Sequence, residues 1–264
     1  MSNNETPTVA IRTKKNSSLV RALEITKSDP EAVGMISAGS TGAVLAGGIF
    51  KIGRIKGVLR PALCPLLPTM KGGKVCIIDC GANVDCRPEY LVQFALMGSS
   101  YMKACGVENP RVALVSVGVE DKKGNELTHE VFARLKQLPL NFVGNMEARD
   151  ALSGEYDVLV CDGFVGNVLL KSIEGTASMV MKTMKKEVMS SFSAKIGALL
   201  MKKALGNLKT AMDYHAFAGA ASLGVEKILV KSHGSSNAKS VTACVKQVLD
   251  LNELKLVESI RSAV

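Results

Sequence analysis

A turn of mixed charge follows the apolar run "RVALVSVG" at residues 111–118. It carries Lys123, Asn125 and Glu126 in "VEDKKGNELT", at positions where a buried strand would end and a helix would begin. A lysine ammonium group placed there can hold an oxyanion, and an asparagine amide can donate a further hydrogen bond. An ordinary solvated turn is the alternative explanation of the same residues.

Five further clusters of glycine and small polar residues also follow apolar runs. Backbone N–H groups and hydroxyl groups at the start of a helix bind phosphate well, so these clusters predict an anion site wherever several of them meet. Each cluster alone also fits an ordinary helix cap or turn. The candidate phosphate- and substrate-binding residues are Ser37, Gly39, Ser40, Thr41, Asn83, Asp85, Glu126, Gly166, His233, Gly234, Ser235 and Ser236.

Six short runs rich in valine and isoleucine predict the strands that position these clusters. They cover residues 32–37, 74–79, 111–118, 141–145, 156–162 and 227–232. Helical patterns separate or follow the runs, at residues 40–55, 88–105, 126–138, 167–192 and 236–264. Continuous apolar runs alternating with helices indicate a mostly parallel sheet that is covered on both faces.

The predicted fold class is therefore α/β, a three-layer α/β/α sandwich with a doubly wound, mostly parallel sheet. We expect one domain over residues 1–264, with a helical amphipathic excursion at about 176–212. Because the carboxyl ends of parallel strands share one edge of a sheet, the polar clusters are expected to converge on one crevice there.

The composition of the chain narrows the classes of binding partner. The chain has 264 residues, 47% of them hydrophobic, and a net charge of +9, which favours phosphate, acidic proteins or an anionic membrane over neutral partners. Basic residues interleaved with aromatic ones are absent, which disfavours nucleic acid. The seven cysteines form no C-x-x-C pair, so reduced thiols in a cytoplasmic protein are expected and no metal site is predicted.

Several familiar catalytic motifs are absent. There is no G-x-x-x-x-G-K-[ST], no G-x-G-x-x-G after a strand and no G-x-S-x-G elbow. A covalent acyl-enzyme route therefore has little support, and no cofactor is predicted.

The segment 188–209, "VMSSFSAKIGALLMKKALGNLK", predicts an amphipathic helix. Its apolar face would carry Phe192, Ile196, Leu199 and Leu200, and lysines would line another face at Lys195, Lys202 and Lys209. Such a helix can lie on an anionic membrane. It can equally pack on the rest of its own chain or on a partner subunit.

Many of these stretches together resemble the bacterial phosphate acyltransferase (PlsX) family of phospholipid synthesis. The resemblance is collinear from about Pro7 nearly to the C-terminus, although the family's first strand and Gly-Gly-Asp turn have no counterpart here. It rests on "RTKKNSS", "ISAGSTGA", "GRIKGVLRPAL", "DCGANVDCRPEYLVQFALMGS", "NPRVALVSVGVEDKKGNELT", "NFVGNMEARD", "VLVCDGFVGNVLLKSIEG" and "KSHGSSNA".

The resemblance implies a fold similar to isocitrate and isopropylmalate dehydrogenases, and a homodimer. It implies conversion of acyl-acyl-carrier-protein and inorganic phosphate to acyl phosphate, with Lys123 important for activity. Gly166, Asn167 and Lys171 also resemble the G-N-x-x-x-K of phosphotransacetylases. The segment at about 188–209 corresponds to the family's membrane-contacting element, which implies a cytoplasmic protein bound peripherally to the inner face of the cell membrane.

Together these expectations give a catalytic set of Lys123, Asn125, Asn167 and Lys171, in which phosphate attacks the thioester directly. The expected membrane contacts are Phe192, Lys195, Ile196, Leu199, Leu200 and Lys202. Two alternatives stay open on the sequence. One is an NAD-dependent decarboxylating dehydrogenase, with Asp79, Asp85 and Asp162 as possible metal ligands. The other is a non-catalytic membrane scaffold that binds a carrier protein.

Overall fold

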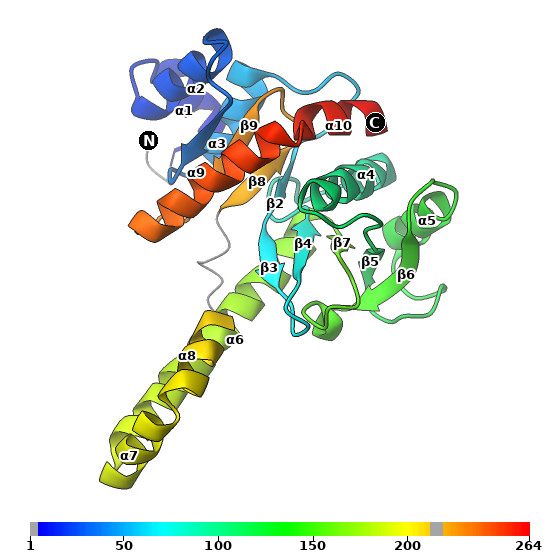
Figure 1. Ribbon diagram of the computed structural model, residues 1–264. Coiled ribbons are helices and arrows are strands. Elements are labelled where there is room, and N and C mark those ends of the chain that lie inside the picture. Colours follow the sequence, from blue (N-terminus) through cyan, green and yellow to red (C-terminus); the bar gives the residue numbers. More distant parts are fainter. Residues whose placement is uncertain (1–4, 212–218) are drawn as a thin grey trace.

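The computed structural model describes residues 5–211 and 219–264, within which nine strands form two sheets (Figure 1). The four-stranded sheet has the order β1-β9-β8-β2, and the five-stranded sheet has the order β3-β4-β7-β5-β6. Strands β1 and β9 are parallel, as are β4, β7, β5 and β6, whereas β2, β3 and β8 run antiparallel to their neighbours. The strand bounds are β1 Gly34–Ser37, β2 Ala62–Cys64, β3 Leu66–Pro68, β4 Lys74–Ile78, β5 Val112–Ser116, β6 Phe142–Glu147, β7 Val158–Val160, β8 Ala220–Leu223 and β9 Ile228–Lys231.

The α/β fold class and all six predicted strands are confirmed, but the single sheet is not. The division occurs at Pro65, which separates β2 from β3 within one extended segment. Proline has no N–H group to donate to a ladder, so the segment changes partners there. On the two sides of Pro65, Leu63 O accepts from Cys80 N at 2.9 Å and Pro65 O accepts from Ile77 N at 3.2 Å.

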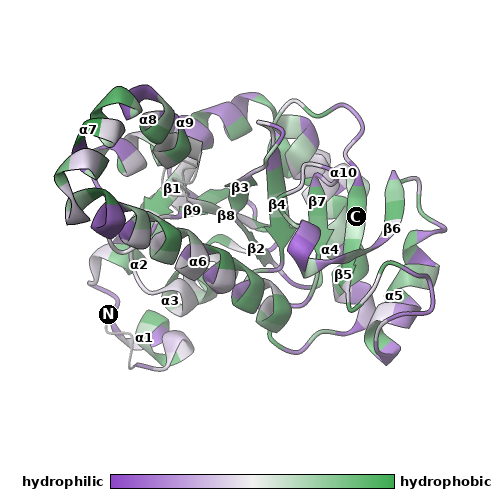
Figure 2. Cartoon of the chain, turned by 90° about the horizontal axis from the view of Figure 1, so that it is seen from below, coloured by the Kyte–Doolittle hydropathy of each residue, from purple (hydrophilic) through white to green (hydrophobic). Residues whose placement is uncertain are grey.

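Alternate residues of the five-stranded sheet enter two separate cores. Cys76, Ile78, Val158 and Val160 pack with α4 (Pro88–Ala104), where a Cβ on Gly98 would meet Val158 at 2.6 Å. Their neighbours Val75, Ile77, Leu159 and Cys161 pack on the other face with Leu169 of α6 (Gly163–Ser190). This alternation follows from the two-residue repeat of a strand, and it makes the three layers. Figure 2 shows the hydrophobic strands between the helices.

The remaining helices complete the layers. Two of them, α1 and α2, lie before the first predicted strand, where no helix was predicted. The predicted C-terminal helix is two helices, because Lys255 adopts a left-handed conformation with φ 51° between them. The bounds are α1 Pro7–Thr13, α2 Ser18–Ser28, α3 Thr41–Gly47, a π-helical turn Gly48–Ile52, α5 Glu126–Leu135, a 3-10 turn Ala148–Asp150, α9 Ala238–Glu253 and α10 Leu256–Ala263.

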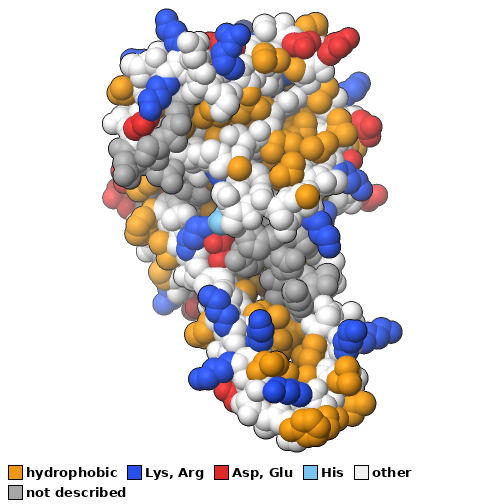
Figure 3. Space-filling view, turned by 90° about the vertical axis from the view of Figure 1, so that its left-hand side faces the viewer, with side chains coloured by type: hydrophobic (Ala, Val, Ile, Leu, Met, Phe, Trp, Pro, Cys, Tyr) orange, Lys and Arg blue, Asp and Glu red, His pale blue; other side chains and the backbone are white. Residues whose placement is uncertain are grey.

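Residues 176–211 form an arm that projects from the two sheets (Figure 1). The arm consists of the distal part of α6, then α7 (Phe192–Leu200) and α8 (Lys202–Ala211). The predicted continuous helix over 188–209 is interrupted, since Ser191 is extended and its Oγ caps α7 by accepting from Ala194 N at 3.1 Å. Figure 3 shows hydrophobic side chains gathered at the far end of the arm, with lysine side chains around them. The side chain of Lys209 and the whole of His215 lie outside the described residues.

Candidate active site

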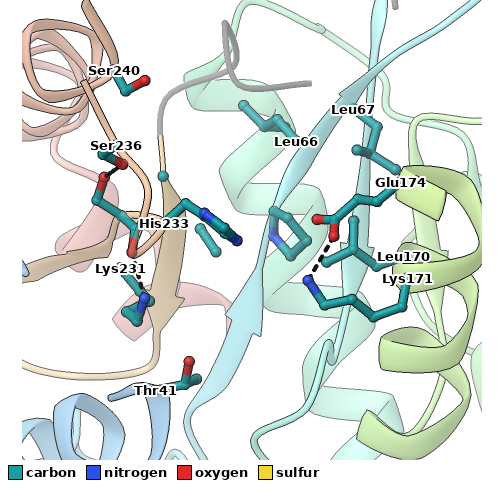
Figure 4. A pocket seen from close by; sticks show the side chains of 14 residues that line it. Thr41, Leu66, Leu67, Leu170, Lys171, Glu174, Lys231, His233, Ser236 and Ser240 are labelled. Carbon is teal, nitrogen blue, oxygen red and sulfur yellow. Dashed lines mark hydrogen bonds and ion pairs between the residues drawn. The ribbon is translucent and has the colours of Figure 1, made fainter. Parts of the chain in front are cut away.

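A pocket of about 140 Å³ lies where the two sheets meet (Figure 4). The four-stranded half contributes the end of β9 and the starts of α3 and α9, and the five-stranded half contributes β3 and the second turn of α6. Chain segments far apart in the sequence therefore close around one small cavity that has both polar and apolar lining residues. Its lining is Thr41, Pro65, Leu66, Leu67, Leu170, Lys171, Glu174, Gly219, Ala220, Lys231, Ser232, His233, Ser236 and Ser240.

Two lysines face this pocket from opposite sides. Lys171 on α6 forms an ion pair with Glu174, with 2.7 Å between Nζ and Oε2. Lys231, at the end of β9, donates to the carbonyl oxygen of Ser232 and has no carboxylate within ion-pair distance in the described part of the chain. Burial lowers the pKa of Lys231, and the charge of Lys171 lowers it further. An anion bound in the pocket would raise the pKa of Lys231 again, because its negative charge would stabilise the ammonium group.

Hydroxyl groups and a histidine surround these cations. The Ser232 and Ser236 hydroxyl oxygens lie 2.5 Å apart, and His233 Nδ1 lies 2.6 Å from Ser235 Oγ. Asn237 begins the following helix by accepting from Ser240 N at 3.1 Å, which explains why the loop turns back toward the pocket. The lining thus offers several rotatable hydroxyl donors beside two ammonium groups, a combination suited to phosphate oxygens.

A second group of predicted residues lies at the start of α6. The buried carboxylate of Asp79 organises the loop beside it. This carboxylate is 0% exposed and accepts from Leu63 N at 2.8 Å, Cys80 N at 2.7 Å and Asn83 N at 2.5 Å, among other N–H groups. Burial raises the pKa of Asp79, and these hydrogen bonds oppose that increase. The carboxylate therefore folds the 79–83 loop against the end of β4.

Two glycines let α6 approach that loop closely. Gly163 N donates to Asn83 O at 2.7 Å, and a Cβ on Gly166 would lie 2.0 Å from Asp79 O. Asn167 lies on the same side of the helix, since a Cβ on Gly81 would be 3.7 Å from its side chain. Asn83, Gly166 and Asn167 are therefore brought together at the first turn of α6, one turn before Lys171.

The turn that contains Lys123 lies apart from the pocket. Its backbone is held by Lys123 N donating to Glu120 O at 2.9 Å and by Ser116 Oγ donating to Lys123 O at 3.1 Å. The Asn125 side chain caps α5 by accepting from Thr128 N at 2.9 Å. The turn does not line the pocket. The parallel pairing of β4, β7 and β5 nevertheless puts it on the sheet edge where the 79–83 loop and α6 begin.

The predicted site residues thus fall into four groups. Thr41, Lys171, His233 and Ser236 line the pocket, whereas Asn83, Gly166 and Asn167 meet beside it and Lys123, Asn125 and Glu126 lie on the β5 turn. The others, Ser37, Gly39, Ser40, Asp85, Gly234 and Ser235, belong to the loops after β1, β4 and β9 and do not line the pocket.

The sequence analysis missed Lys231, Ser232, Glu174 and Ser240 as pocket residues. A signal existed for Lys231, because it ends an otherwise apolar run directly before "SHGSSNA". Glu174 stands three residues after Lys171, a spacing at which helical side chains form ion pairs. The meeting of α6 with β9 is a tertiary contact that no local pattern records.

The cysteines near this region are poor candidates for a nucleophile. All seven are free thiols, and Cys80 Sγ lies 3.3 Å from Gly166 O. Burial raises the pKa of Cys80 and of Cys86 to about 12, so both stay protonated at neutral pH. Within residues 5–211 and 219–264 there is also no group of three or more His, Cys, Asp or Glu side chains that could hold a metal ion.

The exposed face of α7 forms a second candidate surface. Phe192 is 80% exposed, Leu199 70% and Leu200 84%, and Ile196 is also exposed. Lys195 and Lys202 are exposed next to them. No helix among the described residues is both long and apolar enough to cross a membrane.

Comparisons with known proteins agree on one family. A family model described as "Fatty acid synthesis protein" matches residues 1–258. A phosphate acyltransferase of Clostridium novyi (strain NT) is 51% identical over 263 residues, which cover 99% of this chain and 79% of that protein.

Solved structures show the same fold at low sequence identity. A phosphotransacetylase from Streptococcus pyogenes aligns with a TM-score of 0.54 and 14% identity, covering 99% of this chain and 75% of that one. A 4-hydroxythreonine-4-phosphate dehydrogenase from Klebsiella pneumoniae aligns with a TM-score of 0.50 and 11% identity, covering 93% and 71%. These likenesses confirm the predicted dehydrogenase-like fold class.

Proposed function

The chain belongs to the fatty acid synthesis protein family of phosphate acyltransferases, and on that premise we propose that it converts acyl-acyl-carrier-protein and inorganic phosphate to acyl phosphate. The observation that supports this proposal most strongly is the pocket between Lys171 and Lys231. Two ammonium groups, a histidine and several hydroxyls around about 140 Å³ suit a small oxyanion.

The reaction needs no nucleophile from the protein. An oxygen of ionised phosphate attacks the thioester carbonyl carbon, a C–O bond forms, and the C–S bond then breaks to release the carrier's thiol as thiolate. A thioester is already an activated acyl group, so the protein has to supply proximity and stabilisation of charge. The high pKa of the Cys80 thiol is consistent with this route.

We assign phosphate binding to Lys171, Lys231, Thr41, His233 and Ser236. The neighbouring Asn167 would donate to the thioester carbonyl at the start of α6, where Gly166 and Asn83 pack beside it. Lys123 and the Asn125 amide N–H group would stabilise the developing oxyanion from the same sheet edge. The cap at Asn125 uses the side-chain oxygen, which leaves the amide nitrogen available as a donor.

The face of α7 supports a peripheral contact with an anionic membrane. Exposed leucine and phenylalanine side chains can enter the interface, and lysines beside them can contact acidic headgroups. This contact would deliver the hydrophobic acyl phosphate to lipid synthesis at the inner face of the cell membrane, which makes the protein cytoplasmic.

An exposed apolar patch at the start of α6 supports a homodimer. Phe164 is 63% exposed and Val168 49%, and they lie one helical turn apart. Val84, Val117 and Val119 are also exposed, on loops at the same sheet edge. Apolar side chains exposed in one patch mark an interaction surface, and a second copy of the chain would bury them.

One assay tests the enzymatic proposal. The protein is incubated with acyl-acyl-carrier-protein, with and without inorganic phosphate, and acyl phosphate is trapped with hydroxylamine. We expect product only when phosphate is present. Reduction of a nicotinamide cofactor would instead identify the dehydrogenase. Binding of the carrier protein without any product would identify the scaffold, and either result would contradict the proposal.

A further inference from the structure

Two stretches of the sequence that the proposed reaction does not use converge on one tyrosine. They are "GRIKGVLRPAL", which contains Arg60, and "DCRPEYL", which contains Arg87 and Tyr90. Arg87 donates to the Tyr90 hydroxyl oxygen from Nε at 3.0 Å and from Nη2 at 2.8 Å. The guanidinium carbon atoms lie 4.8 Å (Arg87) and 5.7 Å (Arg60) from the centre of the tyrosine ring.

Neither arginine of this pair forms an ion pair within the described part of the chain. Both arginines are exposed, whereas Tyr90 is buried, and neither guanidinium has a carboxylate within ion-pair distance among the described residues. The nearby Glu89 pairs with Arg134 instead, at 3.2 Å. The guanidinium groups of Arg60 and Arg87 lower the pKa of Tyr90 because they stabilise its phenolate form. Positive potential is therefore concentrated at this point.

Hydrogen bonds fix the pair to the edge of the candidate active site. Asn83 Nδ2 donates to Pro61 O at 2.9 Å, which ties the Arg60 loop to the 79–83 loop. Asn83 O in turn accepts from Gly163 N at 2.7 Å at the start of α6. The arginines thus stand on the same loops that adjoin Asn167, on the outer surface of the protein.

We propose that Arg60 and Arg87 form the docking site for carboxylates of the acidic carrier protein that presents the acyl thioester. This proposal rests on the proposed function, because it names how the donor of that reaction is held. Planar guanidinium groups recognise carboxylates through paired hydrogen bonds, and Tyr90 holds the two groups in place before the partner arrives. An open surface suits a protein partner, since a small anion would be screened there by salt.

The test compares acyl donors with and without the carrier. We expect Arg60→Gln/Arg87→Gln to raise the KM for acyl-acyl-carrier-protein about tenfold with little change in kcat. The same variant should leave KM and kcat for acyl-pantetheine, which has neither protein nor phosphate, within twofold of the unaltered protein. Added salt should raise the carrier KM of the unaltered protein much more than that of the variant. Arg21→Gln on α2, which also removes an exposed arginine, is the control and should change nothing.

Several results would overturn the proposal. An unchanged KM for acyl-acyl-carrier-protein is one. A rise in KM for phosphate with every donor would assign the arginines to the small substrate. A rise of equal size with acyl-phosphopantetheine would assign them to the phosphate of the prosthetic group. Arg60→Gln alone is measured as well, because it leaves the hydrogen bonds between Arg87 and Tyr90 in place.

A binding measurement separates this proposal from the proposed function. Fluorescence anisotropy of a labelled carrier protein reports docking whether or not acyl phosphate is formed. Arginine-dependent binding without turnover would contradict the reaction and leave the docking site standing. Turnover with binding that is the same in the double variant would contradict the docking site and leave the reaction standing.

Discussion

At the scale of single residues, the pocket combines one lysine that is already paired with one that is not. Lys171 has Glu174 at 2.7 Å, whereas the one hydrogen-bond acceptor of Lys231 among the described residues is a backbone carbonyl. We infer that Lys231 supplies the charge that an incoming phosphate neutralises, and that Glu174 keeps Lys171 in place. Phosphate binding should therefore depend on pH through Lys231.

Phosphate binding should weaken with rising pH earlier than an ordinary lysine would allow. Lys231 binds an anion only while it is protonated, and burial lowers its pKa, so the KM for phosphate should rise as the pH passes through that lowered value. In Lys231→Arg the guanidinium stays charged, and this rise should move to higher pH. Steady-state kinetics across the alkaline range measure the effect. An identical profile in both proteins would show that Lys231 does not hold phosphate.

A substitution of Lys123 tests whether the turn at residues 119–128 takes part in the reaction. We expect Lys123→Ala to lower the rate of acyl phosphate formation ~10²–10³-fold, the usual cost of losing one oxyanion donor. Thermal unfolding should hardly change, because the backbone of the turn is held by bonds to Glu120 and Ser116. Lys122→Ala in the same turn is the matched control. Near-normal turnover of Lys123→Ala would remove this residue from the mechanism.

At the scale of elements, α6 links the sheet edge, the pocket and the arm, so its first turn controls the position of Lys171. Gly166→Ala should destabilise the protein by about 2 kcal/mol, because the added methyl group would overlap Asp79 O. Phosphate binding should weaken as α6 shifts. Urea unfolding and the KM for phosphate measure the two effects.

Gly175→Ala in the same helix provides the opposite case. Nothing lies within 4 Å of a Cβ at that position, so the substitution should stabilise the helix by about 1 kcal/mol. If both alanine variants had the same stability, the close contact between α6 and the 79–83 loop would be refuted.

The face of α7 gives a prediction about lipid. Leu199→Glu/Leu200→Glu should reduce binding to phosphatidylglycerol vesicles by tenfold or more, because two exposed apolar side chains would no longer enter the interface. Acyl phosphate formation in solution should persist. Val241→Glu, an exposed apolar position on α9, is the control. Co-sedimentation that is equal for all three proteins would argue against the arm as the membrane contact.

Sequence patterns predicted elements well where the pattern is local. The six valine- and isoleucine-rich runs all became strands, and β4, β5 and β7 are buried along nearly their whole length. Strands β2 and β3 were missed because Pro65 interrupts the segment that forms them, and β8 was missed because its two alanines are weak strand formers. Pro7 at the first position of α1 and Ser17 as the cap of α2 were usable signals for helices near the N-terminus.

The site was predicted less completely than the fold. Glycine and serine clusters drew attention to Thr41, His233 and Ser236, and these three residues line one pocket. The pocket is also lined by β3 and the second turn of α6. These elements reach it because the two sheets meet there, and patterns within single segments do not show such an arrangement. The positions of Lys123 and Asn125 relative to a bound substrate stay a prediction.

At the scale of the whole molecule, the exposed patch on α6 predicts association. We expect sedimentation to give twice the chain mass of 27.9 kDa, and Val168→Glu to give the single mass because a carboxylate would be buried in the interface. Val143→Glu, an exposed apolar position on β6, should remain associated. A single-chain mass for the unaltered protein would leave the patch without its proposed partner.

The length of helix α6 affects where the reaction takes place relative to a membrane. It runs unbroken for 28 residues, or about 40 Å at 1.5 Å per residue, from the loop around Asp79 to the turn that starts α7. If α7 rests on lipid, this rod acts as a ruler that sets how far the reacting carbonyl stands above the bilayer. Inserting two whole turns between Gly175 and Ser190 would lengthen the ruler without altering the chemistry. The gap that the fatty product must cross would then grow by a known amount.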